Sequence, residues 1–299
     1  MTRIQANILL LLAAMIWGSS FVVQQIGTGE LGTIMFTGCR FFVGGLLILP
    51  LALHQYGKRH ANGLQIHKGD WYGMVLTGCV LFIAAALQQH GILRTTVTNS
   101  GFLTALYVPL VPILGLVALR RKVHFIIWPA SICSFIGTFI LSGAKEVELA
   151  AGDLWVISST LFWATHVILV GIFATRTQAP LVLAACQFLV SGCIGILLGV
   201  VVEGPDFADI AGAAWGIGYI GIFSVGMAFT LQVVGQRYTP AADAAIILSS
   251  ETVFAALGGM IFLSERLSLM QLSGGLLILL SILAVELVPL TRLGKPRTL

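Results

Sequence analysis

The sequence predicts an all-α integral membrane protein, with ten transmembrane helices arranged as two inverted five-helix repeats around a central cavity. Three observations predict this fold class: an extreme apolar composition, a regular succession of apolar stretches, and a weak internal repeat with an odd number of spans in each copy.

The composition excludes a soluble protein. Of 299 residues, 58% are hydrophobic and only 9% are charged, whereas soluble domains carry about 25% charged residues. The longest polar break, residues 54–70, is too short for a soluble catalytic or nucleic-acid-binding domain. We therefore expect the chain to contact the lipid bilayer and no nucleic acid.

Apolar stretches of about 20 residues, each able to cross the hydrocarbon core as a helix, recur between short polar breaks. We expect ten spans, at residues 6–26, 33–54, 71–92, 98–119, 125–143, 154–174, 181–202, 212–235, 242–263 and 269–289. The first span is expected to be a retained helix rather than a signal peptide, because Trp17 and two serines interrupt what would otherwise be a plain aliphatic core.

Positive charges in the loops predict the orientation. With the N-terminus inside, twelve basic residues fall on the cytoplasmic side: Arg3, Lys58, Arg59, Lys68, Arg120, Arg121, Lys122, Arg176, Arg237, Arg292, Lys295 and Arg297. Only three fall on the outer side: Arg94, Lys145 and Arg266. Because cytoplasmic loops are enriched in Lys and Arg, we expect a multi-pass protein of the inner membrane with both termini cytoplasmic.

The cysteines predict no special chemistry. All five lie inside expected spans and form no CxxC pair, and buried thiols in lipid act mainly as small apolar residues. We therefore expect no disulfide, no metal site and no cofactor.

The two halves of the chain resemble each other at a steady offset. "ALQQHG" (86–91) faces "TLQVVGQ" (230–236), which aligns Gln88 with Gln232, 144 residues later. Each copy holds five expected spans, so the second copy enters the membrane from the opposite side. Inverted repeats of this kind are typical of secondary transporters, which exchange the conformations of two halves around one central site.

Glu251 and Tyr107, also 144 residues apart, each lie near the middle of an expected span, and Ser100 and Thr104 share one helix face with Tyr107. An ionisable group at membrane depth costs about 2.5–3.5 kcal/mol and normally faces the bundle interior or water. We expect Glu251 to bind a cationic or amino group of a solute or to exchange a proton. The alternative is that it accepts hydrogen bonds from a neighbouring helix and only locks packing.

Two tryptophans lie far from the membrane interfaces where this residue is enriched. Trp17 and Ser20 correspond to Trp163 and His166 at an offset of 146 residues, all near mid-span. This position predicts a cavity that stacks or sieves solutes, with plain packing as the alternative. His166 either carries a proton or is a hydrogen-bonded core residue.

Three further polar residues are assigned coupling or structural roles. Arg40 lies about two helical turns below the outer end of its span, so it either snorkels to the interface, makes a structural pair or contacts solute. Gln88 lies toward the outer end of its span and Gln232 toward the inner end of its own. They are expected either to form polar vestibules on opposite faces or to be wet helix ends.

The stretch 244–287, which begins "AAIILSSETVFAALGG", resembles the closing pattern of the EamA-type domain of the drug/metabolite transporter (DMT) superfamily. That pattern has a mid-span Glu, a small-residue stretch, a Ser-Glu-Arg-Leu turn and a Gly-rich last helix. "WGSSFV" (17–22) and "RFFVGGLLILPLAL" (40–53) resemble the first-copy pattern. The resemblance implies two EamA repeats, 1–145 with five helices and 146–299 with five helices and a short basic cytoplasmic tail.

The same resemblance implies a non-enzymatic permease that exports or exchanges small metabolites, commonly amino acids and related compounds. The chain has no ATP-binding motif, so the expected driving force is an electrochemical gradient, with proton coupling as one form, or the solute's own gradient. The family often has Glu-Pro where this chain has Glu251-Thr252, and this departure leaves open whether the helix is kinked there.

Two alternatives to a transporter are considered, an intramembrane enzyme and a membrane-embedded sensor or interaction protein. An intramembrane enzyme needs paired aspartates, a His-rich metal cluster or an activated serine, and no span has such a set. A membrane-embedded sensor or interaction protein would bind a small molecule without transport. The pattern predicts no particular oligomeric state.

Overall fold

The computed structural model describes residues 1–95, 97–120, 123–143, 151–262 and 267–288, and every regular element in these ranges is helical. The first half contains α1 (Arg3–Ile26), α2 (Thr33–Ala61), α3 (Lys68–Ile92), α4 (Val97–Thr104), α5 (Tyr107–Leu119) and α6 (Ile127–Ser142). The second half contains α7 (Ala151–Thr177), α8 (Pro180–Val202), α9 (Phe207–Gly212), α10 (Ala214–Tyr219), the π-helix η1 (Ile220–Phe229), α11 (Thr230–Gln236), α12 (Ala241–Leu248), α13 (Glu251–Phe262) and α14 (Leu269–Leu287).

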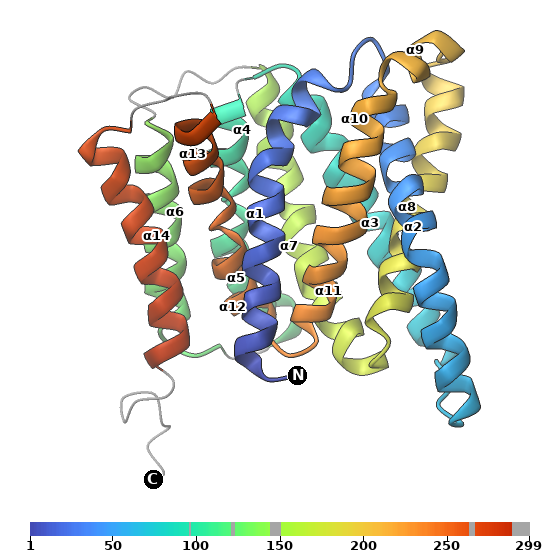
Figure 1. Cartoon of the computed structure of the whole chain (residues 1–299). Helices are drawn as coiled ribbons and strands as arrows, with labels where there is room; N and C mark the ends of the chain where they lie inside the picture. Colours follow the sequence, from blue (N-terminus) through green and yellow to red (C-terminus); the bar gives the residue numbers. More distant parts are fainter. Residues whose placement is uncertain (96, 121–122, 144–150, 263–266, 289–299) are drawn as a thin grey trace.

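Within the described residues, eight helices are long and apolar enough to cross a membrane. A further apolar helix, α6, has 16 residues. The segment expected as the span 242–263 is divided into α12 and α13, and its last residue lies outside the described residues. The predicted all-α integral membrane fold class is confirmed, and the long helices run side by side between an upper and a lower face (Figure 1).

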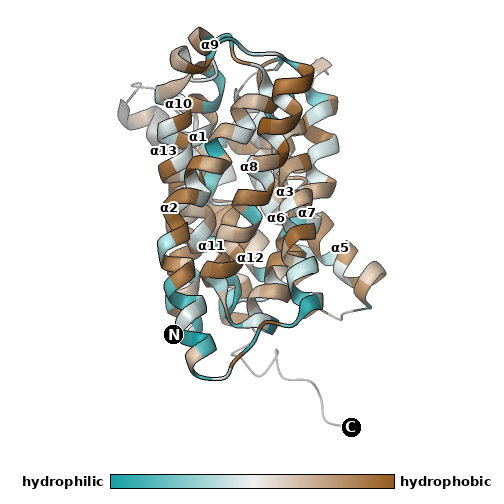
Figure 2. Ribbon diagram, turned by 90° about the vertical axis from the view of Figure 1, so that its right-hand side faces the viewer, coloured by the Kyte–Doolittle hydropathy of each residue, from teal (hydrophilic) through white to brown (hydrophobic). Residues whose placement is uncertain are grey.

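The outer surface of the bundle is apolar. Large aliphatic side chains such as Val117, Leu197, Val201 and Leu276 are exposed, and hydrophobic residues cover the helices along most of their length (Figure 2). An exposed apolar surface of this extent marks contact with lipid or with other apolar surfaces. Together with the spanning lengths of the helices, it identifies a multi-pass membrane protein.

The corresponding first helices of the two halves run in opposite directions. The end of α1 lies beside the end of α3, where the Gln25 side chain donates a hydrogen bond to the carbonyl oxygen of Thr95 (3.3 Å). The end of α7 lies beside the start of α3, where Arg176 forms an ion pair with Asp70 (2.7 Å). Helix α1 therefore runs parallel to α3 and α7 antiparallel to it, as inversion requires.

The packing partners also follow the inverted symmetry. Helix α2 packs against its own counterpart α8, and α6 packs against its counterpart α14. The contact of α3 with α7 is matched by the contact of η1 and α11 with α1. A pseudo-two-fold axis exchanges these pairs, which leaves the region between α1, α7 and the divided helices as the common centre.

Glycines bring α2 and α8 into backbone contact. A Cβ atom added to Gly38 would lie 2.4 Å from the amide nitrogen of Ile196, and one added to Gly195 would lie 2.5 Å from the Cα of Gly38. Small residues allow such close approach in membranes, where packing rather than hydrophobic exclusion drives association. The two helices therefore pack as a close pair at one side of the bundle (Figure 1).

Candidate functional site

A cavity of about 60 Å³ lies at the centre of the bundle. Its walls come from α1, α2, α3, α4, α5, α7, η1, α11, α12 and α13. It is lined by Trp17, Ser20, Phe21, Gln24, Arg40, Phe41, Gln88, Thr104, Tyr107, Trp163, Val167, Ser224, Val225, Phe229, Gln232, Leu248 and Glu251. Both halves of the chain contribute to the cavity, as a site on a pseudo-two-fold axis demands.

Two helices are interrupted at equivalent points beside this cavity. Helix α4 ends at Thr104 and α5 begins at Tyr107. The corresponding positions in the second half, 144 residues later, are Leu248 at the end of α12 and Glu251 at the start of α13. The helix is thus broken before Glu251 although no proline follows it. In inverted-repeat membrane proteins, interrupted helices in corresponding positions mark the binding site near the midplane.

The Glu251 carboxylate faces the cavity. The residue is 5% exposed, and its side chain makes no hydrogen bond or ion pair with any residue that the structure describes. Gly18 of α1 allows the backbone at this point to come close, since an added Cβ atom would lie 2.8 Å from the carbonyl oxygen of Glu251. The carboxylate is therefore left available to a solute, to water or to a proton.

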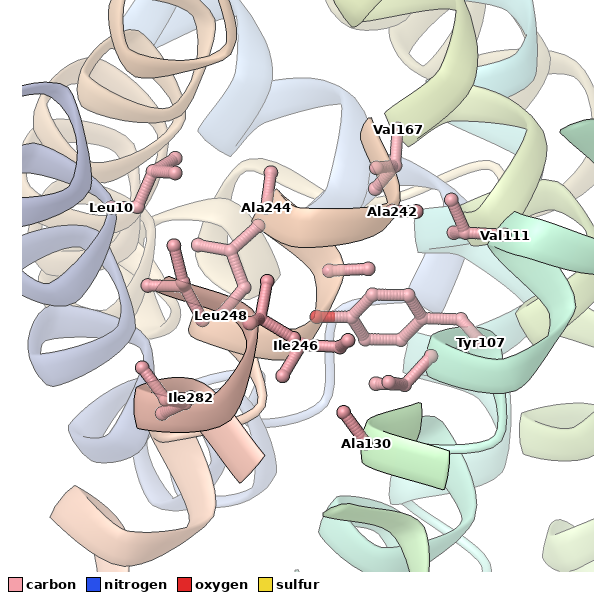
Figure 3. Packing of buried hydrophobic residues seen from close by; sticks show 14 of the residues in the cluster. Leu10, Tyr107, Val111, Ala130, Val167, Ala242, Ala244, Ile246, Leu248 and Ile282 are labelled. Atoms are coloured by element: carbon pink, nitrogen blue, oxygen red, sulfur yellow. The ribbon is translucent and has the colours of Figure 1, made fainter. Parts of the chain in front are cut away.

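Tyr107 holds the equivalent position in the first half of the chain. Its ring projects from α5 toward α12, among Val111, Ala130 and Ile246 (Figure 3). The side chain is 5% exposed and borders the cavity. Packing of the ring in the apolar cluster leaves little freedom for it to move.

Arg40 is buried rather than extended to the interface. It is 4% exposed, and its Nη1 donates a hydrogen bond of 2.5 Å to Oε1 of Gln24. The guanidinium also lies over the rings of Phe36 and Phe41. It has no ion-pair partner among the described residues. Snorkelling is thus wrong for Arg40, which has a structural partner and borders the cavity.

Aromatic rings form one side of the cavity. The rings of Trp17 and Phe229 are 4.6 Å apart edge to face, and Trp163 stacks on Phe229 at 5.9 Å. The Trp17 indole nitrogen donates to the carbonyl oxygen of Ser224 (3.4 Å). Ser20 lies one turn further along α1 on the same wall. These contacts place both predicted tryptophans at the cavity.

The aligned glutamines do not lie in separate vestibules. Gln88 and Gln232 both line the central cavity. Gln88 donates to the hydroxyl of Thr104 (2.9 Å), which in turn donates to the carbonyl oxygen of Ser100 (2.7 Å). The expected vestibules on opposite faces are therefore wrong for this pair, because the symmetry axis brings equivalent residues to the same central space.

A second cavity, of about 510 Å³, lies below the first. It is bordered by the lower ends of several helices and includes Arg3, His124, Arg237 and Asp243. A chain of hydrogen bonds connects residues that border the two cavities: Gln232 donates to Gln236 (2.9 Å), and Gln236 donates to the carbonyl oxygen of Val167 (2.9 Å). Gln232 borders the upper cavity and Gln236 the lower one.

Two of the predicted site residues do not border the central cavity. His166 is fully buried, and its Nε2 lies 2.9 Å from Oε1 of Gln187. The ring centroids of Trp163 and Phe229 lie 5.9 and 6.0 Å from that of His166. Ser100 is also fully buried and supports Thr104 through its backbone carbonyl. Both residues sit behind the cavity wall.

The residues that line the cavity but were not predicted from the sequence are Phe21, Gln24, Phe41, Val167, Ser224, Val225, Leu248 and Phe229. Gln24 lies seven residues after Trp17 and four after Ser20, so the same helix-face spacing could have found it. Phe229 lies three residues before Gln232, so the same spacing could have found it as well.

Comparison with known proteins identifies the family. The model of the EamA-like transporter family matches the chain twice, over residues 4–143 and 150–287. The chain belongs to the EamA-like transporter family. The predicted resemblance is thereby confirmed, and this EamA-family protein is a membrane transporter.

Similar proteins cover almost the whole chain. An uncharacterized transporter of Archaeoglobus fulgidus is 29% identical over 289 residues, 95% of this chain and 87% of that protein. The uncharacterized inner membrane transporter YicL of Salmonella typhimurium is 23% identical over 290 residues, 93% of either chain. A crystal structure of another protein, 17% identical, superimposes with a TM-score of 0.77 over 96% of this EamA-family chain and 98% of its own, and that likeness shows the fold alone.

Proposed function

We propose that this EamA-family transporter moves small zwitterionic metabolites, such as amino acids and related compounds, across the inner membrane by alternating access. One observation carries the proposal: the cavity wall holds a carboxylate, Glu251, and a guanidinium, Arg40, and neither is ion-paired within the described residues. A buried unpaired charge costs several kcal/mol. A solute with one ammonium and one carboxylate would neutralise both groups at once.

Alternating access is supported by the inverted packing and by the two interrupted helices. When two similar halves exchange conformations, a central site opens first to one face and then to the other. The lower cavity, about 510 Å³, would form the inner part of the route. In this proposal the bond between Gln232 and Gln236 must break before solute passes between the cavities.

The lower face is proposed to be cytoplasmic, with both termini on that side. Lys58, Arg59, Arg176 and Arg237 lie at helix ends that face it, and positive charge favours the cytoplasmic side. We propose export or exchange as the direction, with proton coupling at Glu251. A proton on the carboxylate would replace the ammonium group when solute leaves, so the buried site never carries an unpaired negative charge.

Counterflow in proteoliposomes tests the proposal. The panel pairs labelled amino acids with the corresponding amines, which lack the carboxylate, and the corresponding acids, which lack the amine. We expect zwitterions to accumulate above the level of protein-free liposomes, and each single-charge analogue to do so at least about 10-fold less. Binding without accumulation, read as thermal stabilisation by solute, would indicate the sensor. If neither binding nor flux is observed, the proposed zwitterion class is wrong.

Substitution of Arg40 tests the carboxylate subsite. In Arg40→Leu, counterflow of an amino acid is expected to fall about 10-fold or more, because a charged hydrogen bond worth roughly 1.5–3 kcal/mol is lost. Counterflow of the matching amine, already weak, is expected to change little. An equal proportional loss for both solutes would assign Arg40 only the structural role of holding Gln24.

A further inference from the structure

The span Ala214–Gln236 changes its helical register at the cavity. Residues Ile220–Phe229 form a π-helix, in which hydrogen bonds join residues five apart instead of four. Ser224, Val225 and Phe229 from this segment line the cavity. Phe229 lies five residues after Ser224 and four after Val225, so this part of the π-helix turns one face to the cavity.

The neighbouring small residue of the same segment has different surroundings. Four residues after Ser224 stands Ala228, which is fully buried in the apolar cluster that contains Leu10 and Ala244. In this segment the large ring of Phe229 lines the cavity, whereas the small Ala228 packs among apolar side chains. Short π-helical segments inside α-helices are frequent at functional sites.

The first half of the chain has no equivalent of this ring. The residue that corresponds to Phe229 is Ala85, in the regular helix α3, and α3 contributes Gln88 alone to the cavity lining. A bulky ring at this position is thus supplied by one repeat only. Pseudo-symmetry does not require it, which points to a role in the choice of solute.

Phe229 is surrounded by other aromatic rings. Its ring lies 5.8 Å from that of Phe41, 6.1 Å from Phe188 and 6.0 Å from His166, while the two tryptophans flank it on the cavity side. Surrounded by rings, the side chain has no space into which to withdraw. The ring is thus a firmly packed part of the wall of the cavity of about 60 Å³.

We propose that Phe229, presented by the π-helix, sets the upper size limit for the side chain of the transported solute. This inference rests on the proposed function. Zwitterions with small side chains are accepted, and those with bulky side chains are excluded by the ring. Specificity for size is then a property of one residue, separate from charge recognition by Glu251 and Arg40.

Two alanine variants test this assignment. Counterflow and solute-induced thermal stabilisation are measured for wild type, Phe229→Ala and Phe223→Ala, with glycine, alanine, leucine, phenylalanine and tryptophan as solutes. Phe223 is the matched control, because it lies in the same π-helix with its ring partly exposed on the outer surface. Phe229→Leu is added as a second variant in case removal of the whole ring prevents folding.

We expect wild type to favour the small solutes. Phe229→Ala should raise the preference for phenylalanine and tryptophan over alanine by about 10-fold or more, Phe229→Leu by less, and Phe223→Ala not at all. Three results would each overturn the proposal. Wild type could transport tryptophan as well as alanine, the solute preference could stay unchanged in both Phe229 variants, or it could shift equally in Phe223→Ala. A shifted binding profile without flux would support the size limit while contradicting transport. Absence of both binding and flux in wild type would remove both proposals.

Discussion

Glu251→Gln is expected to lower amino-acid counterflow by about 30-fold or more while the protein still folds. The amide keeps the shape of the side chain but loses the charge that would pair with an ammonium group, and loss of such a contact costs at least roughly 2 kcal/mol. The amide also cannot exchange a proton. The measurement is initial-rate counterflow in proteoliposomes at matched protein content.

Stability separates the functional role of Glu251 from a structural one. A carboxylate that locked helix packing would accept hydrogen bonds from a neighbour, and among the described residues none is made. The thermal midpoint of Glu251→Gln should therefore equal or exceed that of wild type. Glu30→Gln, at an exposed loop residue, is the control and should change neither quantity. Normal flux in Glu251→Gln would make the assigned role wrong.

Gly38→Ala is expected to cause the largest loss of stability. The added methyl group would lie 2.4 Å from the Ile196 nitrogen and 2.5 Å from the Gly195 carbonyl carbon. These are backbone atoms in a helix and can move away only if α2 and α8 separate. Overpacking of this kind costs about 1–3 kcal/mol or more, and we expect the upper end. Thermal unfolding in detergent should show a midpoint lowered by roughly 5 °C or more.

The same helix supplies the control. Gly57 also lies in α2, but a Cβ atom there would meet nothing within 4 Å. Gly57→Ala should leave the midpoint unchanged or raise it, because alanine favours a helix over glycine by up to about 1 kcal/mol. Equal losses in both variants, or none in Gly38→Ala, would contradict backbone contact between α2 and α8.

The repeat offset alone predicts part of the site. Translating Glu251 by 144 residues leads to Tyr107, and the two residues begin the second halves of equivalent interrupted helices. The offset also pairs Gln88 with Gln232, which share one cavity. Equivalent residues come to the same space because a pseudo-two-fold axis passes through the site, although the separate vestibules expected for the two glutamines were wrong.

Other site residues depended on packing that a single sequence does not encode locally. Arg40 turns inward because Gln24 and two phenylalanine rings hold it there. His166 lies three residues after Trp163 and therefore on the same helix face, yet it sits behind the cavity wall beside Gln187. The spacing of residues on a helix gives the face on which a side chain lies, and only the neighbouring helices decide whether that face meets a cavity or another side chain.

Composition, span length and the repeat by themselves determined that this chain is an all-α membrane protein with two inverted halves, because bilayer thickness and the cost of burying charge restrict what such a sequence can form. The tertiary structure alone decided the register of the span Ala214–Gln236 and the interruption of the helix before Glu251. Both depend on hydrogen bonds shifting by one residue, a small local change whose direction is set by the close packing of several helices around the cavity.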